Sequence, residues 1–383
     1  MIGVCLKCQQ RNYGSKLQAL ATLNIFRDLG KDFRIIRYKK RGLSFKLKSI
    51  PRIFNIVFLN DRYDSWQKAY SFKKHPEVGK KISMRNALFK KFDECYFEKY
   101  YRDIDYYTQL KEEACNYSTI VTCSDQLWSP SALATNFYNL MFVPDHINKV
   151  SFASSFGVSK IPWYQKRRTK KYIERIEHVS VRENQGQIIV KELTGRDVPV
   201  LMDPVFLYTK EEWEYLIPAK KIELPSYVLC YFLGSSIAYR MAAKKFALEN
   251  NLKIVTLPHL DRYVVEDEKN ADFPLFNVAP DDFVNLIRNA KYVFTDSFHG
   301  CAFSIIMEKK FLVFNRYLET SVNSKNSRID TVCDNLGLNN CRVFANDLDS
   351  LEKVKVDIDY RLVKDKLQIY VDSAKKYLKE SIK

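Results

Sequence analysis

The chain has 383 residues, of which 46% are hydrophobic and 14% aromatic, and it carries a formal net charge of +17. This composition excludes a disordered chain, and the length exceeds what one hydrophobic core usually holds, so we expect two domains. No apolar segment approaches the roughly 20 residues of a membrane-spanning helix. The first residues also lack the features of a secretory signal peptide. We therefore expect a cytoplasmic protein.

The positive charge is concentrated in the first quarter of the chain. Residues 1–100 contain 23 Lys and Arg residues against 8 Asp and Glu residues, and the rest is nearly balanced. Such a field indicates an anionic partner, which could be membrane headgroups, a charged lipid-linked substrate or nucleic acid. The alternative is an ordinary solvated basic face. The basic segment 39–59 is the part that could rest on a membrane.

The first half of the chain alternates short apolar runs with longer amphipathic stretches. IGVCL (2–6) and FRIIRY (33–38) are predicted strands, and 16–30 is a predicted helix capped by Gly30, with NYGS (12–15) as the turn before it. Residues 39–100 are basic and aromatic, and we expect helices and loops there. Further strands are predicted within 118–128, 149–157, 177–183 and 198–207.

A second series begins after the Pro- and Lys-rich segment 218–225, which we interpret as a linker. Strands are predicted within 226–234, 253–258, 291–297 and 311–316, and helices over 237–251, 281–290, 301–310 and 359–383. The alternation predicts an α/β protein with two Rossmann-like domains, 1–217 and 225–383, facing each other across a cleft. The last helix closes the second domain.

Polar residues that follow the predicted strands are candidates for the ligand site. The segments 12–15 and 297–300 open helices, whose unpaired N–H groups can bind an anion. Arg182 offers a fork-shaped cation, and His299 could touch an anion and transfer a proton. The sequence contains no G-x-G-x-x-G after its first strand and no G-x-x-x-x-G-K-[ST] motif, which argues against ordinary dinucleotide and P-loop sites.

Each candidate also has an ordinary structural interpretation. His299 could simply cap a helix or be held by hydrogen bonds. Arg182 could form a surface ion pair with Glu183, and Asp125 could cap a helix, since Asp is a preferred N-cap residue. Cys5 and Cys8 form an isolated C-x-x-C, which is weak evidence for zinc without further ligands. We expect no metal.

Seven blocks occur in order along the chain, at 12–21, 123–130, 151–157, 179–183, 203–207, 281–307 and 326–338. In these blocks the chain resembles the polysaccharide pyruvyl transferase family. NYGSKLQALA (12–21) is similar to the family motif N-Y-G-x-x-L-Q-A. CSDQLWSP (123–130) is similar to G-S-D-Q-x-W-N-P, with Cys123 and Ser129 as departures. The closest block is 281–307.

The resemblance implies a GT-B-like fold and transfer of pyruvate from phosphoenolpyruvate to two hydroxyls of a sugar, as a cyclic ketal on a surface polysaccharide. It places Arg182 and His299 in the donor site. Asp125 is a possible base for the acceptor hydroxyl. Donor binding is expected at Asn12, Gly14, Ser15, Ser297, Gly300 and Arg328. No cofactor is implied, because phosphoenolpyruvate is itself the donor substrate.

One departure from the family pattern affects the donor site. Some members carry an arginine where Ser297 stands, so Arg328 or an N-terminal lysine could supply the missing charge, or the donor could differ. The acceptor could be lipid-linked, with the protein at the inner face of the membrane. Two alternatives stay open: a GT-B nucleotide-sugar glycosyltransferase, and a nucleic-acid-binding protein driven by the net charge.

Overall fold

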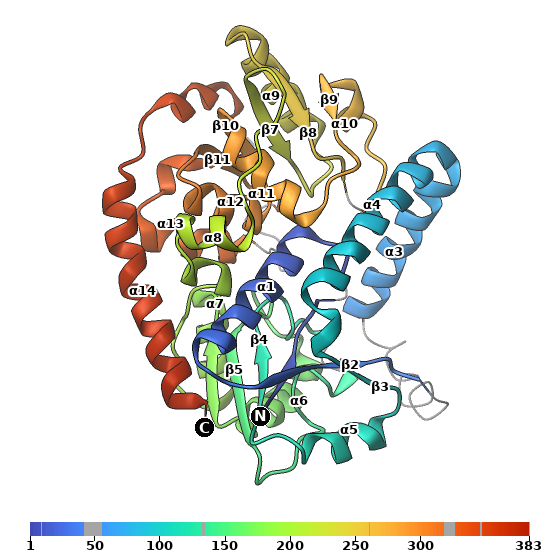
Figure 1. Cartoon of the computed structure of the whole chain (residues 1–383), viewed down its shortest axis with the longest axis vertical. Helices are drawn as coiled ribbons and strands as arrows, with labels where there is room; N and C mark the ends of the chain where they lie inside the picture. Colours follow the sequence, from blue (N-terminus) through green and yellow to red (C-terminus); the bar gives the residue numbers. More distant parts are fainter. Residues whose placement is uncertain are drawn as a thin grey trace.

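The computed structural model describes residues 1–8, 10–41, 56–131, 135–259, 261–317, 326–344 and 347–382. Most of the basic segment 39–59 therefore lies outside the described residues. The architecture is α/β, with two parallel six-stranded sheets stacked along the long axis of the molecule (Figure 1).

The N-terminal sheet has the strand order β3-β2-β1-β4-β5-β6, and every pair in it is parallel. This is the doubly wound order, in which the chain reverses direction across the sheet between the first and fourth strands. Its strands are β1 (Ile2–Cys5), β2 (Phe33–Tyr38), β3 (Tyr101–Ile104), β4 (Thr119–Cys123), β5 (Asn148–Ser154) and β6 (His178–Val181).

The C-terminal sheet repeats the same topology, because its order β12-β11-β10-β7-β8-β9 is the doubly wound order counted from β7. The strands are β7 (Tyr227–Tyr231), β8 (Lys253–Thr256), β9 (Phe273–Pro274), β10 (Tyr292–Thr295), β11 (Lys310–Phe314) and β12 (Arg342–Val343). The predicted class of two Rossmann-like units in a GT-B-like arrangement is confirmed. Nothing tests the domain boundaries 1–217 and 225–383, which stay a prediction.

Helices cover the faces of both sheets. Those of the first half are α1 (Tyr13–Asp28), α3 (Ile56–Lys74), α4 (Pro76–Tyr96), α5 (Tyr107–Ala114), α6 (Lys166–Glu174), α7 (Asn184–Thr194) and α8 (Lys210–Leu216). Those of the second are α9 (Ile237–Glu249), α10 (Glu266–Lys269), α11 (Pro280–Asn289), α12 (Phe298–Ile306), α13 (Ser327–Leu336) and α14 (Tyr360–Ser381). In the described part of the chain, none of them combines the length and apolar character that a membrane span requires.

Short 3₁₀ helices connect some of these elements. They are η2 (Glu98–Tyr100), η4 (Trp163–Gln165), η5 (Pro204–Leu207), η6 (Asn339–Cys341) and η7 (Leu348–Lys355). The one that positions the site is η5, because Asp203 caps it by accepting a hydrogen bond from the backbone N–H of Val205 at 3.1 Å.

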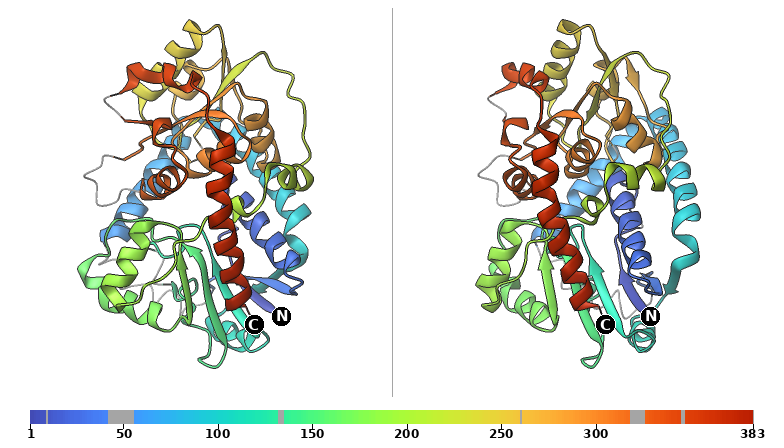
Figure 2. Two further views of the ribbon diagram at one scale, coloured as in Figure 1. Left: turned by 90° about the vertical axis from the view of Figure 1, so that its left-hand side faces the viewer. Right: turned by 60° about the vertical axis from the view of Figure 1, so that its left-hand side comes forward.

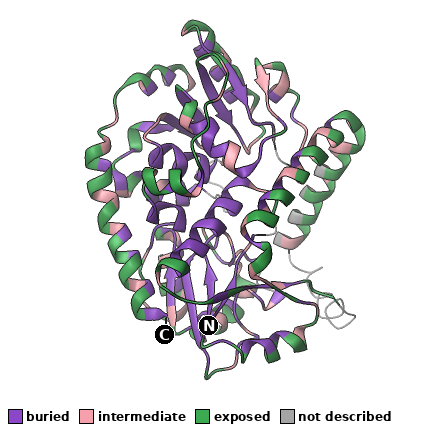
Figure 3. Cartoon of the chain, in the orientation of Figure 1, coloured by how far each residue is buried: buried purple, intermediate pink, exposed green. Residues whose placement is uncertain are grey.

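Helix α1 lies in the seam between the two sheets and is buried along most of its length (Figure 3). Asn12 caps its start by accepting from the N–H of Ser15 at 3.2 Å. The chain leaves it through Gly30, whose φ of +63° favours glycine, as predicted. At its first residue, Tyr13 stacks on Phe283 of α11, with ring centroids 5.0 Å apart. Helix α1 thereby joins the N-terminal unit to the C-terminal one.

The two units share buried apolar side chains, since one cluster contains Ile2 and Val121 from strands of the first sheet together with Leu229 of β7 and Phe283 of α11. Helix α14 runs from the C-terminal unit back to the first sheet, so that both chain ends lie close together (Figure 2). There the hydroxyl of Tyr377 donates to the carbonyl oxygen of Ser151 at 2.9 Å.

Several predicted boundaries were wrong. Residues 198–207 do not form a strand: they contribute one bridge, between Val181 and Val200, and then η5. Pro199 and Pro204 have no N–H to donate to a ladder, which explains the failure. NYGS is not a turn, because α1 already begins at Tyr13, and α12 begins at Phe298 rather than at Cys301.

Candidate active site at the seam between the sheets

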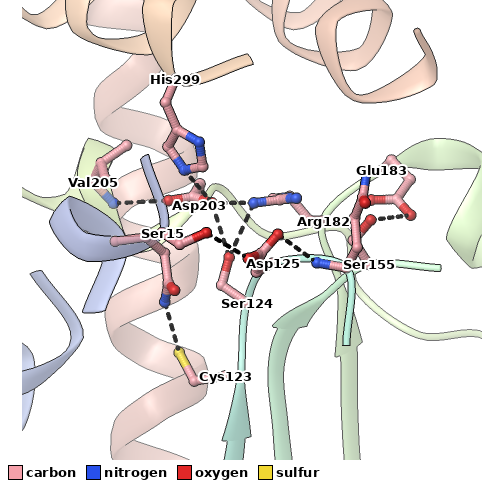
Figure 4. A network of polar contacts seen from close by, with 12 residues as sticks. Ser15, Cys123, Ser124, Asp125, Ser155, Arg182, Glu183, Asp203, Val205 and His299 are labelled. Atoms are coloured by element: carbon pink, nitrogen blue, oxygen red, sulfur yellow. Dashed lines mark hydrogen bonds and ion pairs between the residues drawn. The ribbon is translucent and has the colours of Figure 1, made fainter. Parts of the chain in front are cut away.

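The loops that follow four strands meet in the seam between the two sheets. Ser15 lies in the first turn of α1 after β1, Asp125 follows β4, Arg182 follows β6, and His299 lies in the first turn of α12 after β10. These are the carboxyl ends of parallel strands, and the β1/β4 and β7/β10 pairs are the reversal points of the two sheets, where ligands of doubly wound proteins bind. Figure 4 shows the polar network that results.

Arg182 is paired with Asp203, and both side chains are almost fully buried, at 1% and 0% exposure. The Arg182 Nη1 also donates to Ser124 Oγ at 3.2 Å, and that hydroxyl donates to Asp203 Oδ2 at 2.8 Å. The alternative of a surface ion pair between Arg182 and Glu183 is wrong. The buried carboxylate of Asp203 therefore holds the Arg182 guanidinium in one position inside the protein.

Glu183 instead supports the loop after β5. Its Oε1 accepts from Ser155 Oγ at 3.0 Å and from the N–H of Phe156 at 3.0 Å, whereas its Oε2 has no hydrogen-bond partner. The N–H of Ser155 also donates to the carbonyl oxygen of Asp125 at 3.0 Å. This loop therefore fixes the backbone of Asp125.

Asp125 and Ser124 both have left-handed backbones, with φ of +56° and +45°. Non-glycine residues in this region cost roughly 1–3 kcal/mol each and are found preferentially at functional sites. Asp125 Oδ1 accepts from the N–H of Gln126 at 2.7 Å, and Oδ2 accepts from Ser15 Oγ at 2.8 Å. No helix begins at this residue, so the helix-cap alternative is wrong.

The charge of Asp125 is stabilised by its surroundings. Burial raises the pKa of its carboxyl. The charges of Lys7 and Arg182 and the hydrogen bond from the N–H of Gln126 together lower this pKa by more than burial raises it, so it lies below its usual range. Asp125 is therefore an ionised carboxylate at neutral pH and can accept a proton or a hydrogen bond, but it does not serve as an acid.

His299 lies directly against the start of α1. A Cβ atom added to Gly14 would lie 2.0 Å from His299 Nδ1, so only glycine permits this approach. The Nε2 of His299 is buried 3.8 Å from Asp203 Oδ2 and has no hydrogen-bond partner among the residues that the structure describes. Burial lowers the pKa of His299 to about 4, with Asp203 opposing the shift and Arg182 adding to it. The imidazole is therefore neutral at pH 7.

A second buried arginine, Arg328, lies against the same aromatic ring as Arg182, that of Phe298. The ring of Phe298 lies 4.6 Å from the Cζ of Arg182 and 5.7 Å from the Cζ of Arg328. Four buried nitrogen atoms have no hydrogen-bond partner in the described part of the chain: Arg182 Nε and Nη2, Arg328 Nε and His299 Nε2. Burial and the charge of Arg182 lower the pKa of Arg328 to about 10, so it stays charged. Unsatisfied donors of this kind are costly unless a ligand pairs with them.

The other predicted donor-binding residues shape the helix starts. Asn12 uses its side chain to cap α1, and Ser297 caps α12 by accepting from the N–H of Gly300 at 3.4 Å. A Cβ on Gly300 would lie 2.4 Å from Thr295 Oγ1, so this position needs glycine for packing. The structure therefore brings Gly14, Ser15 and Arg328 to the group of Asp125, Arg182 and His299. It leaves Asn12, Ser297 and Gly300 in supporting positions.

Sequence reasoning did not select Asp203, Ser124 or Phe298 for the site. Asp203 and Ser124 follow strand-like runs and were visible as polar residues there, but their pairing with Arg182 depends on long-range contacts. The side chain of Phe298 has no polar atom, so a search for polar residues after strands could not select it. Among the described residues, no group of three or more His, Cys, Asp or Glu side chains could hold a metal ion.

A family model described as polysaccharide pyruvyl transferase matches residues 12–316, which include Asp125, Arg182 and His299. The chain belongs to this family. Direct comparison with curated proteins finds no match. The resemblance of the motifs at 12–21, 123–130 and 281–307 is therefore confirmed at the level of the family.

Solved structures are similar to the chain over nearly its whole length, at low sequence identity. The chain is 11% identical to UDP-GlcNAc 2-epimerase from Neisseria meningitidis bound to UDP-GlcNAc, covering 99% of this chain and 93% of that one, with a TM-score of 0.47. It is 9% identical to an alpha-glucosyltransferase in complex with UDP, with 99% and 95% covered and a TM-score of 0.49. It is 8% identical to Acinetobacter baumannii MurG, with 100% and 98% covered and a TM-score of 0.43.

Proposed function

We propose that this member of the polysaccharide pyruvyl transferase family transfers pyruvate from phosphoenolpyruvate to two hydroxyls of a saccharide, forming a cyclic ketal. The observation that carries the proposal is the set of buried side-chain nitrogen atoms around Phe298 that lack partners among the described residues, from Arg182, Arg328 and His299. Phosphoenolpyruvate carries a carboxylate and a phosphate, which are suited to two guanidinium groups.

Arg328 supplies the charge that some family members place at position 297. It is buried and charged, it faces Phe298 from α13, and it lies on the opposite unit from Arg182. Ser297 in contrast caps α12 and directs no charge into the site. One guanidinium from each unit would bind one end of the donor, so that donor binding holds the two units together.

The reaction balances without an additional reactant. One C–O bond forms from each acceptor hydroxyl to the central carbon of the donor, and the C–O bond to phosphate breaks. One hydroxyl proton ends on the methylene carbon, which becomes the methyl group of the ketal. The other hydroxyl proton leaves with the phosphate. The protein must therefore move two protons and stabilise a departing dianion.

The two proton transfers are assigned to residues of opposite character. Asp125 is an ionised carboxylate and accepts the proton of the attacking hydroxyl. His299 is neutral without ligand, and the phosphate dianion raises its pKa, because an opposite charge within about 4–6 Å favours the protonated form. The imidazolium then delivers its proton to the methylene carbon. No metal or cofactor is assigned a role.

The acceptor is proposed to be a lipid-linked saccharide at the cytoplasmic face of a membrane, reached through the basic N-terminal region. The excess of positive charge in residues 1–100 supports this location, since anionic headgroups attract such a surface. Membership of a transferase family argues against the nucleic-acid alternative, which explains none of the site residues.

The nucleotide-sugar alternative would need an acidic residue free to contact a ribose at the strand ends of the second sheet. Asp296 follows β10 there, but its oxygens already accept from the N–H groups of Leu233 at 2.6 Å and Gly234 at 2.7 Å. Asp267 likewise pairs with Arg240 at 2.6 Å. These carboxylates are used by the fold itself.

Donor binding separates the two functions. We expect phosphoenolpyruvate to raise the melting temperature of the protein and UDP or GDP to leave it unchanged. Arg328→Gln should weaken phosphoenolpyruvate binding by roughly 10- to 100-fold, the effect of losing a charged hydrogen bond to an anion. Stabilisation by UDP and none by phosphoenolpyruvate would assign the chain to nucleotide-sugar chemistry instead.

A further inference from the structure

A row of exposed side chains runs along one face of α3. Leu59, Tyr63, Trp66 and Tyr70 follow one another at alternating spacings of four and three residues, which places them on one face of a helix. Their exposures are 47%, 60%, 60% and 47%. We call this row the α3 stripe. Single exposed apolar residues are ordinary, but a contiguous row of them marks an interaction surface.

The aromatic rings of the stripe stack on one another. The ring centroids of Tyr63 and Trp66 are 6.2 Å apart at 24°, and those of Trp66 and Tyr70 are 5.5 Å apart at 12°. The stacked residues remain exposed to solvent, and much of the described part of α3 is coloured as exposed in Figure 3. The rings are thus preordered for contact with a broad surface.

Basic side chains border the stripe. Lys74 Nζ lies 4.8 Å from the centroid of the Tyr70 ring, and Arg62 and Lys73 are exposed on the same helix. At 100° per residue, Arg62, Lys73 and Lys74 fall beside the stripe and not on the opposite side of the helix. Exposed aromatic rings with cations at their margin suit a surface that is apolar within and negatively charged at its boundary.

The helix is held so that the stripe faces outward. The Nη2 of Arg262 donates to Gln67 Oε1 at 3.1 Å, and the N–H of Tyr263 donates to Ser71 Oγ at 3.3 Å. Helix α3 also packs on α4 (Figure 1). These contacts fix α3 against both units, so the stripe cannot simply turn inward.

We infer that the α3 stripe docks on an anionic phospholipid bilayer. Trp and Tyr rings are favoured at the bilayer interface, and Lys and Arg beside them are attracted by anionic headgroups. A second copy of this chain is the poorer occupant, because pairing two stripes would bring the same cations together in a chain of net charge +17. The inference refines the membrane contact proposed above, but vesicle binding needs neither donor nor acceptor, so the two proposals fail separately.

Trp66 provides a direct probe of docking. The chain has four tryptophans, and Trp128 and Trp213 are buried whereas Trp163 is 84% exposed. In a Trp163→Phe background, Trp66 is therefore the exposed tryptophan. We expect its emission to shift to shorter wavelength, and to be quenched by brominated lipid, with phosphatidylcholine–phosphatidylglycerol vesicles but not with phosphatidylcholine alone. Unchanged emission while the protein binds the vesicles would overturn the inference.

Matched variants test the energetics by vesicle co-sedimentation. Tyr63→Ala/Trp66→Ala/Tyr70→Ala should weaken binding at least 10-fold, and Arg62→Gln/Lys73→Gln/Lys74→Gln roughly 100-fold, the effect of about three surface charges. The control Trp163→Ala/Tyr215→Ala removes rings that are 84% and 86% exposed elsewhere and should bind as the native protein does.

Three results would overturn the assignment. They are native-like binding by the aromatic variant, equal binding to neutral and anionic vesicles, and self-association that the aromatic variant abolishes while vesicle binding is unchanged. Melting temperature and transfer to a water-soluble acceptor should be unchanged in all variants, which shows that any loss lies in docking.

Discussion

Asp203 is the residue on which the buried positive charge of the site depends. It pairs with Arg182, accepts from Ser124 and Val205, and lies near His299. Asp203→Asn keeps the shape but leaves the guanidinium without a counterion. Because breaking a buried pair typically costs about 3–5 kcal/mol, we expect that loss in the free energy of unfolding, together with at least a 100-fold lower turnover. Urea denaturation measures the free energy of unfolding, and the transfer assay measures the turnover.

The control for this prediction is Asp145→Asn. Asp145 also pairs with an arginine, Arg175 Nη2 at 2.7 Å, but its side chain is 88% exposed. Exposed pairs contribute little, so we expect no measurable change. If Asp203→Asn were as stable and active as Asp145→Asn, the buried pair would not organise the site.

The pKa of His299 predicts how donor binding depends on pH. Its pKa is lowered to about 4 in the free protein, and a bound dianion raises it, so binding takes up a proton. Donor affinity should fall as pH rises from about 4 to the pKa of the complex and then stay level. The donor phosphate titrates in the same range, so the measurement is the affinity ratio of native protein to His299→Gln between pH 5 and 9. A constant ratio would contradict the proton uptake.

At the residue scale, the sequence predicted which side chains lie together better than it predicted how they pair. Arg182, His299 and Asp125 were selected because polar residues after parallel strands converge. The ordinary alternative paired Arg182 with the neighbouring Glu183, whereas Arg182 pairs with Asp203, which is distant in sequence. Spacing along the chain carries no information on such pairs. The pKa of His299 likewise follows from burial, which no motif reports.

At the scale of elements, the contact between the starts of α1 and α12 explains the glycine in the N-Y-G motif. Gly14→Ala would improve helix propensity by about 1 kcal/mol, yet its Cβ would overlap the ring of His299. We therefore expect a displaced imidazole and at least a 100-fold loss of turnover, measured with the transfer assay and by thermal melting.

Gly79→Ala is the matched control for this substitution. Gly79 is also a helical glycine, in α4, and nothing lies within 4 Å of its added Cβ. We expect native activity and equal or slightly higher stability. Full activity of Gly14→Ala would show that the packing of His299 on α1 is not needed for turnover.

The strands that the sequence predicted correctly are mostly those buried on both faces of a sheet. Strands such as β1, β7 and β10 are buried on both faces, so their sequences are almost entirely apolar. The short edge strands β3, β9 and β12 were missed, because strands of two to four residues at a margin lack this pattern. Residues 198–207 gave the opposite error, since a strand was predicted where none forms. The segment is apolar, but its two prolines lack the N–H groups that pair a strand with its neighbour.

At the scale of the whole molecule, the shared core predicts cooperative unfolding. Apolar side chains from beside both sheets pack in one cluster, and α14 ties the C-terminal unit to Ser151 of the first sheet. We expect one calorimetric transition, with the calorimetric and van't Hoff enthalpies equal. Tyr377→Ala should lower its midpoint without splitting it. Two separate transitions in the native protein would mean that the units unfold independently.

The architecture was predictable because both halves repeat the same alternation of strands and helices. What the sequence did not reveal is how closely the halves pack through contacts such as the stacking of Tyr13 on Phe283. These contacts join residues far apart in the chain, so local periodicity cannot report them. They also bring Arg182 and Arg328 from opposite units to one aromatic ring.

The central claim is that this seam transfers pyruvate, and label transfer tests it most directly. The protein is incubated with phosphoenolpyruvate labelled in its methylene carbon and with a panel of lipid-linked saccharides, and phosphate release is followed together with the label. We predict one labelled ketal methyl group on the saccharide per phosphate released, reduced at least 100-fold in Arg182→Ala and in His299→Ala. Phosphate release without label on any saccharide, or transfer that survives both substitutions, would contradict the account.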